Sequence, residues 1–289
     1  MNTTKSPRLF CFGLGYSARA IAALLSGEGW RIAGTCRPDT DTGELADLGY
    51  ELHHFDGSGA MNDAATALAG TTHLLSSAPP GAIGDPVLAQ HQADIEFLQG
   101  LEWIGYLSTT GVYGDRNGDW VDESAPLEPS GARGQRRVVA EKAWLGLETA
   151  AAIQCFRLAG IYGPGRSALD TVRNGRARRI IKPGQVFSRT HVDDIAQVLR
   201  ASIQKPSPGA AYNVCDNEAA PPQDVIAYAC ELLDVEPPPE IKFEDAELSD
   251  MAKSFYRDNK RVSNKRIKDE LGVQLKWPNY RDGLRGLIA

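Results

Sequence analysis

The chain has 289 residues, 42% of them hydrophobic, and a formal net charge of −6. This composition is typical of a globular protein long enough to bury a substantial core, and the negative charge argues against a nucleic-acid partner. No segment approaches the roughly 20 apolar residues of a membrane-spanning helix, and no apolar stretch of signal-peptide length precedes the first expected strand. We therefore expect a cytoplasmic protein with no membrane partner.

The cysteines and histidines show no pattern of a disulfide framework or a metal site. The cysteines do not form a CxxC pair, their number is odd, and they lie in apolar runs, which favours buried reduced thiols. They are Cys11, Cys36, Cys155, Cys215 and Cys230. His53 and His54 are adjacent and would point to opposite faces of a strand, so we expect no metal site.

Short apolar runs alternate with helix-like segments through the first half of the chain. The expected strands are 8–12, 31–36, 50–55, 72–78 and 102–109. The expected helices are 17–29, 64–70 and 86–100. This alternation predicts a parallel sheet covered by helices on both faces.

The second half of the chain is more mixed. We expect helices over 133–149, 190–204 and 222–233, and strands over 152–160 and 211–215. A linker with a short strand is expected within 237–245, and the prolines at 206–208 and 221–222 indicate loops. The sequence contains no internal repeat of the kind that marks solenoids or propellers.

A GxGxxA pattern stands between the first expected strand and the first expected helix. Gly13 permits a tight turn, Gly15 leaves room for a phosphate, and Ala18 lets the helix pack closely on the strand. The N-terminus of the following helix would face a pyrophosphate. A tight turn without a ligand is the alternative, but the strand–helix–strand context favours a dinucleotide.

The end of the second expected strand bears on which dinucleotide is bound. NAD-binding proteins usually place an acidic residue there, roughly 20 residues after the first glycine, whereas this chain has Thr35, Cys36 and Arg37. Arginine suits a 2′-phosphate, so NADP is preferred. A solvated surface arginine is the alternative, and Asp39 and Asp41 follow closely enough to leave NAD open.

The chain resembles the extended short-chain dehydrogenase/reductases, the NAD-dependent epimerase/dehydratase family, over nearly its whole length. The motifs that carry the resemblance are GLGYSA (13–18), FDGSG (55–59), YLSTTGVYG (106–114), RLAGIYGPG (157–165), THVDDIA (190–196), YNV (212–214) and NKRIKDELG (264–272). The resemblance implies an α/β fold: a doubly wound parallel Rossmann sheet with a smaller C-terminal α+β substrate domain. The Rossmann domain would comprise 1–165 with a return segment at about 188–215, and the remainder of 166–289 would form the substrate domain.

The resemblance also implies which residues contact the cofactor. Asp56 matches the family's adenine contact, the end of the fourth strand would lie beside the nicotinamide ribose, and Ile161 would lie near the nicotinamide. The expected cofactor-binding residues are Gly13, Leu14, Gly15, Tyr16, Ser17, Ala18, Arg37, Asp56, Gly57, Ser76, Ser77, Ala78, Ser108, Arg137 and Ile161.

The chain departs from the family at its acid/base pair. The family has a tyrosine and a lysine four residues apart, with a glutamate four residues after the lysine. Glu141 anchors the comparison, so Arg133 takes the tyrosine position and Arg137 the lysine position. Arginine keeps its proton in proteins, so Arg133 cannot be a base, although it could bind an anion or polarise a carbonyl. Arg137 could bond the nicotinamide ribose; a solvated helix face including Arg136 is the alternative.

The remaining candidate catalytic residue is Thr109, which matches the family's catalytic Ser/Thr and could hold a substrate oxygen. The alternative for Thr109 is packing at a strand end. Tyr113 and Tyr162 are candidates for a replacement proton donor, because they stand within the matching motifs.

Two smaller departures affect the expected substrate and branch of the family. The first loop is GxGxxA, where most extended members have TGxxGxxG. Phe187 occupies the position, four residues before His191, at which sugar-nucleotide enzymes carry an arginine, and Arg189 is shifted from it. The segment 190–196 is expected to be a capped helix start with a structural role.

Two functions fit the sequence. One is an NAD(P)-dependent oxidoreductase or epimerase with Thr109, Arg133 and Arg137 as its candidate catalytic residues and a small molecule as its substrate. The other is a non-catalytic NAD(P)H-binding sensor or regulatory protein. Family members often pair through helices of the Rossmann domain, so a homodimer stays open.

Overall fold

The computed structural model describes residues 6–288 and divides the chain into two compact units. Unit 1 is formed by Met1–Ser108, Arg136–Phe156 and Ala196–Tyr212. Unit 2 is formed by Thr109–Gln135, Arg157–Ile195 and Asn213–Ala289. The chain passes repeatedly from one unit to the other, so each unit is assembled from segments far apart in the sequence.

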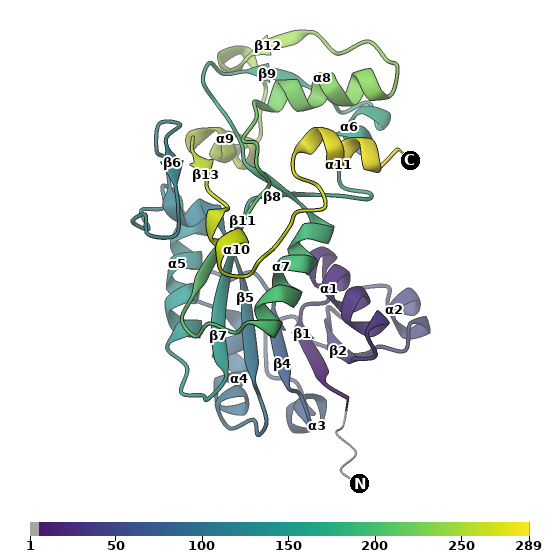
Figure 1. Cartoon of the computed structure of the whole chain (residues 1–289), viewed down its shortest axis with the longest axis vertical. Coiled ribbons are helices and arrows are strands. Elements are labelled where there is room, and N and C mark those ends of the chain that lie inside the picture. Colours follow the sequence, from purple (N-terminus) through teal and green to yellow (C-terminus); the bar gives the residue numbers. More distant parts are fainter. Residues whose placement is uncertain (1–5, 289) are drawn as a thin grey trace. The chain divides into compact units, whose positions relative to one another are not determined.

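A seven-stranded sheet of order β11-β7-β5-β4-β1-β2-β3 is the centre of unit 1 (Figure 1). The strands are β1 (Arg8–Phe12), β2 (Arg31–Cys36), β3 (Glu51–His54), β4 (His73–Ser76), β5 (Trp103–Thr109), β7 (Ala152–Leu158) and β11 (Ala211–Val214). The pairs β1–β2, β1–β4, β2–β3 and β4–β5 are parallel. Because β1 has β2 on one side and β4 on the other, the strand order reverses there, which is where ligands bind in sheets of this kind.

Helices pack on this sheet and close a core around the aromatic residues of its strands. They include α1 (Tyr16–Gly27), α2 (Gly43–Asp47), α3 (Ala64–Leu68) and α4 (Pro86–Glu96), together with parts of α5 (Ala132–Leu145) and α7 (Val192–Gln204), which cross the unit boundary. Every residue of β1 and β4 is buried. Strands that are buried on both faces have continuous apolar sequences. For this reason the strands in the first half of the chain could be predicted from the sequence.

Unit 2 contains three short parallel strand pairs and has its own core. The pairs are β8 (Gly160–Tyr162) with β10 (Arg189–His191), β9 (Arg179–Ile181) with β12 (Glu240–Lys242), and β6 (Trp120–Val121) with β13 (Arg261–Val262). Its helices are α6 (Ala168–Arg173), α8 (Pro222–Leu232), α9 (Asp250–Arg257), α10 (Lys265–Asp269) and α11 (Tyr280–Gly286), with the 3₁₀ turns η1 (Thr110–Tyr113) and η2 (Phe243–Asp245). One core cluster gathers Tyr162, Leu169, Val225, Tyr280 and Leu284.

The structure confirms the predicted α/β fold with its parallel sheet and corrects several element boundaries. The predicted helix 190–204 begins at Val192, because Thr190 and His191 belong to β10. His191 accepts the Asp193 N–H through Nδ1 (3.1 Å) and so serves the helix start. The predicted strand 152–160 is two strands, β7 and β8.

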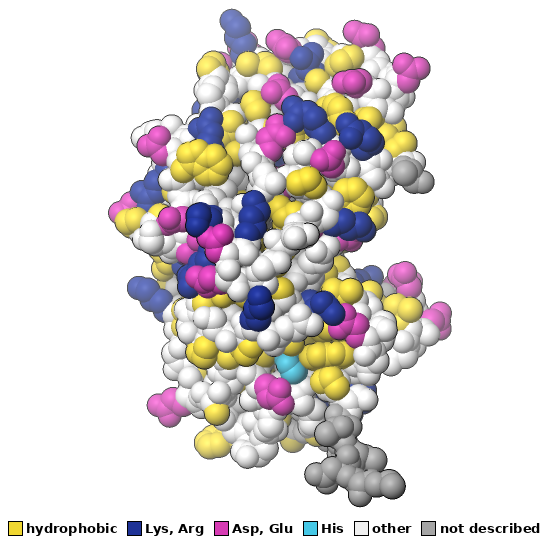
Figure 2. All heavy atoms as spheres, in the orientation of Figure 1, with side chains coloured by type: hydrophobic (Ala, Val, Ile, Leu, Met, Phe, Trp, Pro, Cys, Tyr) yellow, Lys and Arg dark blue, Asp and Glu magenta, His cyan; other side chains and the backbone are white. Residues whose placement is uncertain are grey.

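The expectations about cysteines, metals and membranes have the following outcomes within residues 6–288. All five cysteines are buried and none forms a disulfide, as predicted. No cluster of three or more His, Cys, Asp or Glu side chains that could hold a metal ion occurs in this range, and none of its helices has the length and apolarity to cross a membrane. On the face drawn in Figure 2, acidic and basic side chains are interspersed.

Candidate functional site

The glycine turn of unit 1 is held by hydrogen bonds to two neighbouring strands. The Gly13 N–H donates to Thr35 Oγ1 (2.8 Å) and the Leu14 N–H to the Thr35 carbonyl (2.8 Å), both on β2. The Ser77 hydroxyl, just after β4, donates to the Gly13 carbonyl (2.5 Å). Gly13 has φ of +86°, which favours glycine, and a Cβ there would lie 2.9 Å from Ser77 Oγ. The turn is therefore fixed in place without any ligand.

Gly15 differs from Gly13 in having open space around it. It is exposed, has φ of −83° and stands at the N-cap of α1, and a Cβ built on it would meet no atom within 4 Å. Ala18, one turn into the helix, is fully buried. The N-terminus of α1 carries a partial positive charge and N–H donors with no intrahelical acceptor. The geometry suits an anion such as a diphosphate lying over Gly15.

Two arginines lie around the end of β2. Arg37 is exposed, and its guanidinium makes no ion pair with any described residue. Arg19 donates from Nε to the Leu14 carbonyl (3.0 Å), and its charge partly offsets the rise that burial causes in the pKa of the Cys36 thiol. Arg19 directly follows Ala18 of the glycine motif but was not among the predicted site residues.

The turn after β3 presents Asp56 to solvent. Asp56 Oδ1 accepts hydrogen bonds from the Ser58 N–H (2.8 Å) and hydroxyl (2.7 Å), which lower the pKa of its carboxyl group. Gly57 has φ of +85°, and a Cβ there would lie 2.7 Å from Cβ of Pro86, the first residue of α4. The turn is thus packed on α4, and an ionised carboxylate is held at the carboxyl end of β3.

The end of β4 supplies a buried hydroxyl with no partner. Ser76 is fully buried, and its Oγ has no hydrogen-bond partner within the described part of the chain. A buried polar group without a partner is costly, so a ligand or water that bonds Ser76 is favoured. Ser76, the space at Gly15 and the exposed Arg37 together fit a dinucleotide along the carboxyl end of β1, β2 and β4.

Arg137 reaches from α5 to the end of β5 within unit 1. Its Nη1 donates to Tyr106 OH (3.1 Å) and to the Leu107 carbonyl, and the guanidinium carbon lies 5.6 Å from the centre of the Tyr106 ring. The Tyr106 ring stacks on Trp144 at 5.8 Å. Arg137 is half-buried, so the alternative of a fully solvated helix face does not describe it.

One turn further along α5, Glu141 is buried against the same strand. Its Oε1 accepts a 2.5 Å hydrogen bond from the Ser108 hydroxyl, and both residues are almost inaccessible to solvent. Ser108 therefore has a partner inside the protein, and its role toward a cofactor stays a prediction. The contact also fixes the rotation of α5 about its axis, which places Arg137 at the strand end.

In unit 2, Thr109 begins the turn η1. Its Oγ1 accepts a hydrogen bond from the Gly111 N–H (3.2 Å), so it caps the turn, and its own hydroxyl proton is left to donate. The first turn of α5 packs directly on this segment, because a Cβ on Gly134 would lie 2.7 Å from the Gly111 carbonyl oxygen. Arg133 is exposed, with its guanidinium 5.1 Å from the centre of the Phe255 ring.

The two tyrosines considered as proton donors are enclosed in the core of unit 2. Tyr113 OH donates to Asn213 Oδ1 (2.7 Å) and accepts from Arg157 Nη1 (2.9 Å), and burial raises its pKa to about 12. Tyr162 is buried as well, its hydroxyl faces the Asn279 carbonyl at 3.5 Å, and burial raises its pKa further. Neither is suited to giving a proton to a substrate at neutral pH.

The motif around His191 has the structural role that was predicted, because it joins the start of α7 to the segment at Lys276 and Trp277. Asp193 Oδ2 accepts from Lys276 Nζ (2.9 Å) and Trp277 Nε1 (3.2 Å), while Asp194 accepts from the backbone N–H groups of the same two residues. Arg189 donates inward to the backbone carbonyls of Phe187 (2.8 Å) and Ala220 (3.1 Å).

The structure therefore gathers most of the predicted cofactor residues in unit 1. Gly13 to Ala18, Arg37, Asp56, Gly57, Ser76 to Ala78, Ser108 and Arg137 all belong to unit 1, whereas Ile161, Thr109 and Arg133 belong to unit 2.

The sheet order and the tethered glycine turn define an α/β fold of the NAD-dependent epimerase/dehydratase type, which is also the fold of the solved structures similar to this chain. The resemblance inferred from the sequence is thus confirmed at the level of the fold. The chain belongs to the same family as a functionally unknown conserved protein from Silicibacter pomeroyi. The two are 51% identical, each is covered over 98% of its length, and the TM-score is 0.88.

Two further proteins are similar over most of the chain. YeeZ of Escherichia coli K12 is 28% identical over 280 residues, which cover 92% of this chain and 95% of YeeZ. A dTDP-glucose 4,6-dehydratase from Bacillus anthracis, solved in complex with NAD, is 14% identical with a TM-score of 0.76 and coverage of 98% of this chain and 96% of that one. At that identity the likeness shows the fold alone. No protein-family model matches the chain.

Proposed function

We propose that unit 1 binds a nicotinamide dinucleotide and that the protein is an oxidoreductase or epimerase with an atypical site. The observation that carries the proposal is the contrast within the glycine turn. Gly13 is enclosed and bonded on both sides, whereas Gly15 opens onto empty space at the N-terminus of α1. A turn that only connected a strand to a helix would not need a glycine at the open position. The NAD bound to the structurally similar dehydratase supports the same reading.

NADP is the preferred form of the cofactor in this proposal. No acidic residue stands directly after β2, and the exposed Arg37 has no carboxylate partner among the described residues. Arg19 adds a second positive charge near the same strand end. A 2′-phosphate would satisfy these charges with bidentate hydrogen bonds, whereas an unmodified ribose would not.

Some residues of the proposed site would orient the substrate, and others would supply positive charge. A bound nicotinamide dinucleotide supplies or accepts a hydride. Arg137 would contribute a fixed positive charge and hydrogen bonds to a ribose, because it never releases its proton. The Thr109 hydroxyl would hold a substrate oxygen, and the Arg133 guanidinium would bind an anionic group or polarise a carbonyl. The substrate class that these groups favour is a small carbonyl or hydroxyl compound in the cytoplasm.

A specific observation favours the second candidate function, a non-catalytic NAD(P)H-binding sensor. The two arginines cannot transfer a proton, and Tyr113 and Tyr162 are committed to the core of unit 2. A protein that binds the cofactor but lacks any proton donor would report its redox state without turnover.

Calorimetric titration with NADPH, NADP⁺, NADH and NAD⁺ tests the proposal. We expect binding, tightest for the phosphorylated forms, and Arg37→Ser should weaken NADPH binding about tenfold or more while changing NADH binding little. Absence of binding to all four nucleotides would refute the cofactor site. Thr40→Ala, which alters a residue of the same loop without a charge, is the matched control.

Turnover separates the enzyme from the sensor. NADPH oxidation measured against a panel of small aldehydes, ketones and keto acids should show a substrate if the protein is an oxidoreductase. The double change Arg133→Tyr with Arg137→Lys restores the family pair and should create activity if the native site is merely vestigial. No gain from a folded variant that still binds the nucleotide would exclude a vestigial dehydrogenase site.

A further inference from the structure

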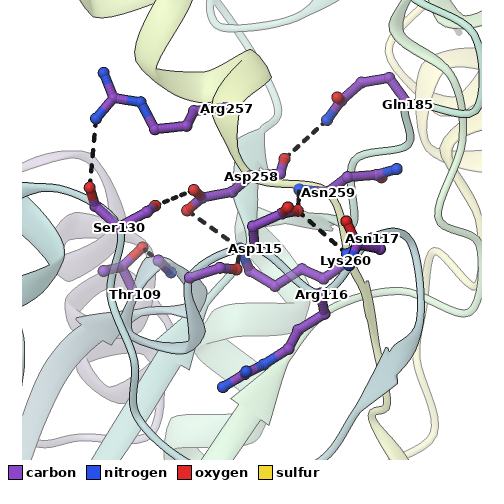
Figure 3. A network of polar contacts seen from close by, with 12 residues as sticks. Thr109, Asp115, Arg116, Asn117, Ser130, Gln185, Arg257, Asp258, Asn259 and Lys260 are labelled. Atoms are coloured by element: carbon purple, nitrogen blue, oxygen red, sulfur yellow. Dashed lines mark hydrogen bonds and ion pairs between the residues drawn. The ribbon is translucent and has the colours of Figure 1, made fainter.

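A polar network in unit 2 surrounds one lysine (Figure 3). Lys260 Nζ donates to the Gly114 carbonyl (2.7 Å) and lies 3.5 Å from Asp258 Oδ2. The exposed fractions of the Lys260 and Asp258 side chains are only 10% and 19%. Gly114 ends the turn η1, which Thr109 begins, so the lysine contacts the segment that carries the candidate substrate-holding hydroxyl.

The backbone around Lys260 is fixed by hydrogen bonds to the loop that follows η1. Asn259 N–H donates to Asp115 Oδ1 (2.7 Å), and the Asn259 carbonyl accepts from the N–H groups of Arg116 (2.9 Å) and Gly118 (3.0 Å). These partners are more than 100 residues away in sequence. Such a clamp holds the Lys260 side chain in one place, which a proton-transfer group requires.

Asp258 is held by hydrogen bonds from two other segments of unit 2. Its Oδ1 accepts from the Ser130 hydroxyl, and its carbonyl accepts from Gln185 Nε2 (2.8 Å). In Figure 3 the Lys260 side chain extends past Asp115 toward the turn that begins at Thr109, and a dashed line joins it to Asp258. The ammonium group has three N–H donors, and two have the partners named above, so one has no partner within the described residues.

The environment gives Lys260 chemistry that the arginines lack. Burial lowers the pKa of its ammonium group below the ordinary value of 10.5; Asp258 and Asp115 offset only part of this fall, and Arg116 adds to it. A lysine with a lowered pKa releases its proton more readily than an exposed lysine, whereas an arginine keeps its proton.

We propose that Lys260 is the proton-transferring residue of the candidate site, and that it serves a carbonyl oxygen held by the Thr109 hydroxyl. The inference rests on the proposed oxidoreductase function. When such a carbonyl is reduced, a reduced nicotinamide would supply the hydride to its carbon, and the Lys260 ammonium would give its proton to the oxygen, which yields an alcohol. The neutral amine then regains a proton from water. Lys260 thereby replaces the tyrosine that position 133 lacks.

The first test does not depend on turnover. Acetaldehyde condenses with an unprotonated amine with loss of water, and cyanoborohydride reduces the resulting imine to an ethylamine, which peptide mapping locates. We expect Lys260 to be ethylated with a pH midpoint at least one unit below that of Lys265, which is 80% exposed and whose pKa Asp269 raises. Ethylation that follows exposure alone, with Lys260 slower than Lys265 at every pH, would overturn the proposal.

The second test separates proton transfer from a structural role. Lys260→Arg keeps the charge and a donor for the Gly114 carbonyl but cannot release a proton. On any carbonyl substrate that the wild type reduces, we expect Lys260→Arg and Lys260→Met to lower kcat about 100-fold or more, with Lys265→Arg unchanged. Rescue of kcat by Lys260→Arg would show that the lysine is structural and would overturn the proposal.

Nucleotide titration of the same variants keeps this inference distinct from the proposed function. Lys260→Arg should bind NADPH as the wild type does. If the wild type binds no nucleotide, the proposed function fails. If nucleotide binds and no carbonyl is reduced, the pH midpoint of ethylation alone decides whether Lys260 has the required reactivity.

Discussion

Replacing Gly15 with alanine should weaken nucleotide binding about tenfold or more and leave the fold unchanged. The new methyl group would meet no protein atom within 4 Å, and φ of −83° is accessible to alanine. Gly→Ala restricts the unfolded chain, which stabilises by roughly 0.4–1 kcal/mol, but alanine is a poorer N-cap by a similar amount. The two effects offset, so the free energy of unfolding should change by less than about 0.5 kcal/mol.

The methyl group would instead occupy the space that a diphosphate needs. Losing close approach to the helix N-terminus should weaken binding by about 1.4 kcal/mol or more, which is tenfold or more in Kd. Calorimetry with NADPH measures this loss, and urea unfolding of the same sample measures stability. Unchanged NADPH affinity in a folded Gly15→Ala protein would refute the reasoning, because the open glycine would then have no ligand to accommodate.

Gly13→Ala is the matched control, because it should lower stability, whereas Gly15→Ala should lower nucleotide affinity alone. At φ of +86° an alanine costs roughly 1–2 kcal/mol, and its Cβ would lie 2.9 Å from Ser77 Oγ, whose 2.5 Å bond to the Gly13 carbonyl would be strained. Losing such a bond costs about 1 kcal/mol. We therefore expect Gly13→Ala to lower the free energy of unfolding by about 2–3 kcal/mol, so that stability and binding fall together.

Three further changes test other parts of the structure. Burial raises the pKa of Asp216 from 3.8 to about 7 despite the nearby Arg189, so the folded state holds a proton there that the unfolded chain releases above pH 4. Stability should thus be lost as pH rises from about 4 to 7, by at most ~4 kcal/mol, and urea unfolding should show this slope flattened in Asp216→Asn; an unaltered slope would contradict the shift. Tyr113→Phe removes two buried hydrogen bonds, to Asn213 and from Arg157, and should lower the free energy of unfolding by about 1–3 kcal/mol, with NADPH affinity unchanged by calorimetry. Glu141→Gln should destabilise by a similar amount in urea unfolding, since the Ser108 hydroxyl loses a charged acceptor; a stability equal to wild type would show that the buried contact contributes nothing.

Much of unit 1 could be predicted because its determinants are local. The strand Arg8–Phe12 is one apolar run, and the turn after it needs glycines at fixed positions. The sequence could not show that Ser77 bonds Gly13 or that Ser76 is left without a partner, because these depend on strands 64 residues apart being adjacent. Arg19 was missed for the same reason.

Unit 2 was harder to predict, because its strands have two or three residues and show no periodicity. The network around Lys260 joins residues separated by 128 and 146 positions. From the sequence alone, a lysine in the segment "RDNKRV" would be expected to be solvated. Its packing against Gly114 and Asp258 buries it. Tyr113 and Tyr162, the replacement donors expected from the family motifs, are both enclosed in the core of unit 2.

The two arginines of α5, Arg133 and Arg137, stand one turn apart, and their contacts within the fold differ. Arg137 donates to a phenol and a backbone carbonyl, and its planar fork still presents further N–H groups. Both hydrogen bonds come from the one nitrogen Nη1, so the remaining N–H groups of the guanidinium are what distinguish arginine from lysine at 137. Arg133 is exposed and lies against the exposed ring of Phe255, which lysine, methionine or leucine would cover as well. In the proposed function, its charge would serve an anionic group on the substrate.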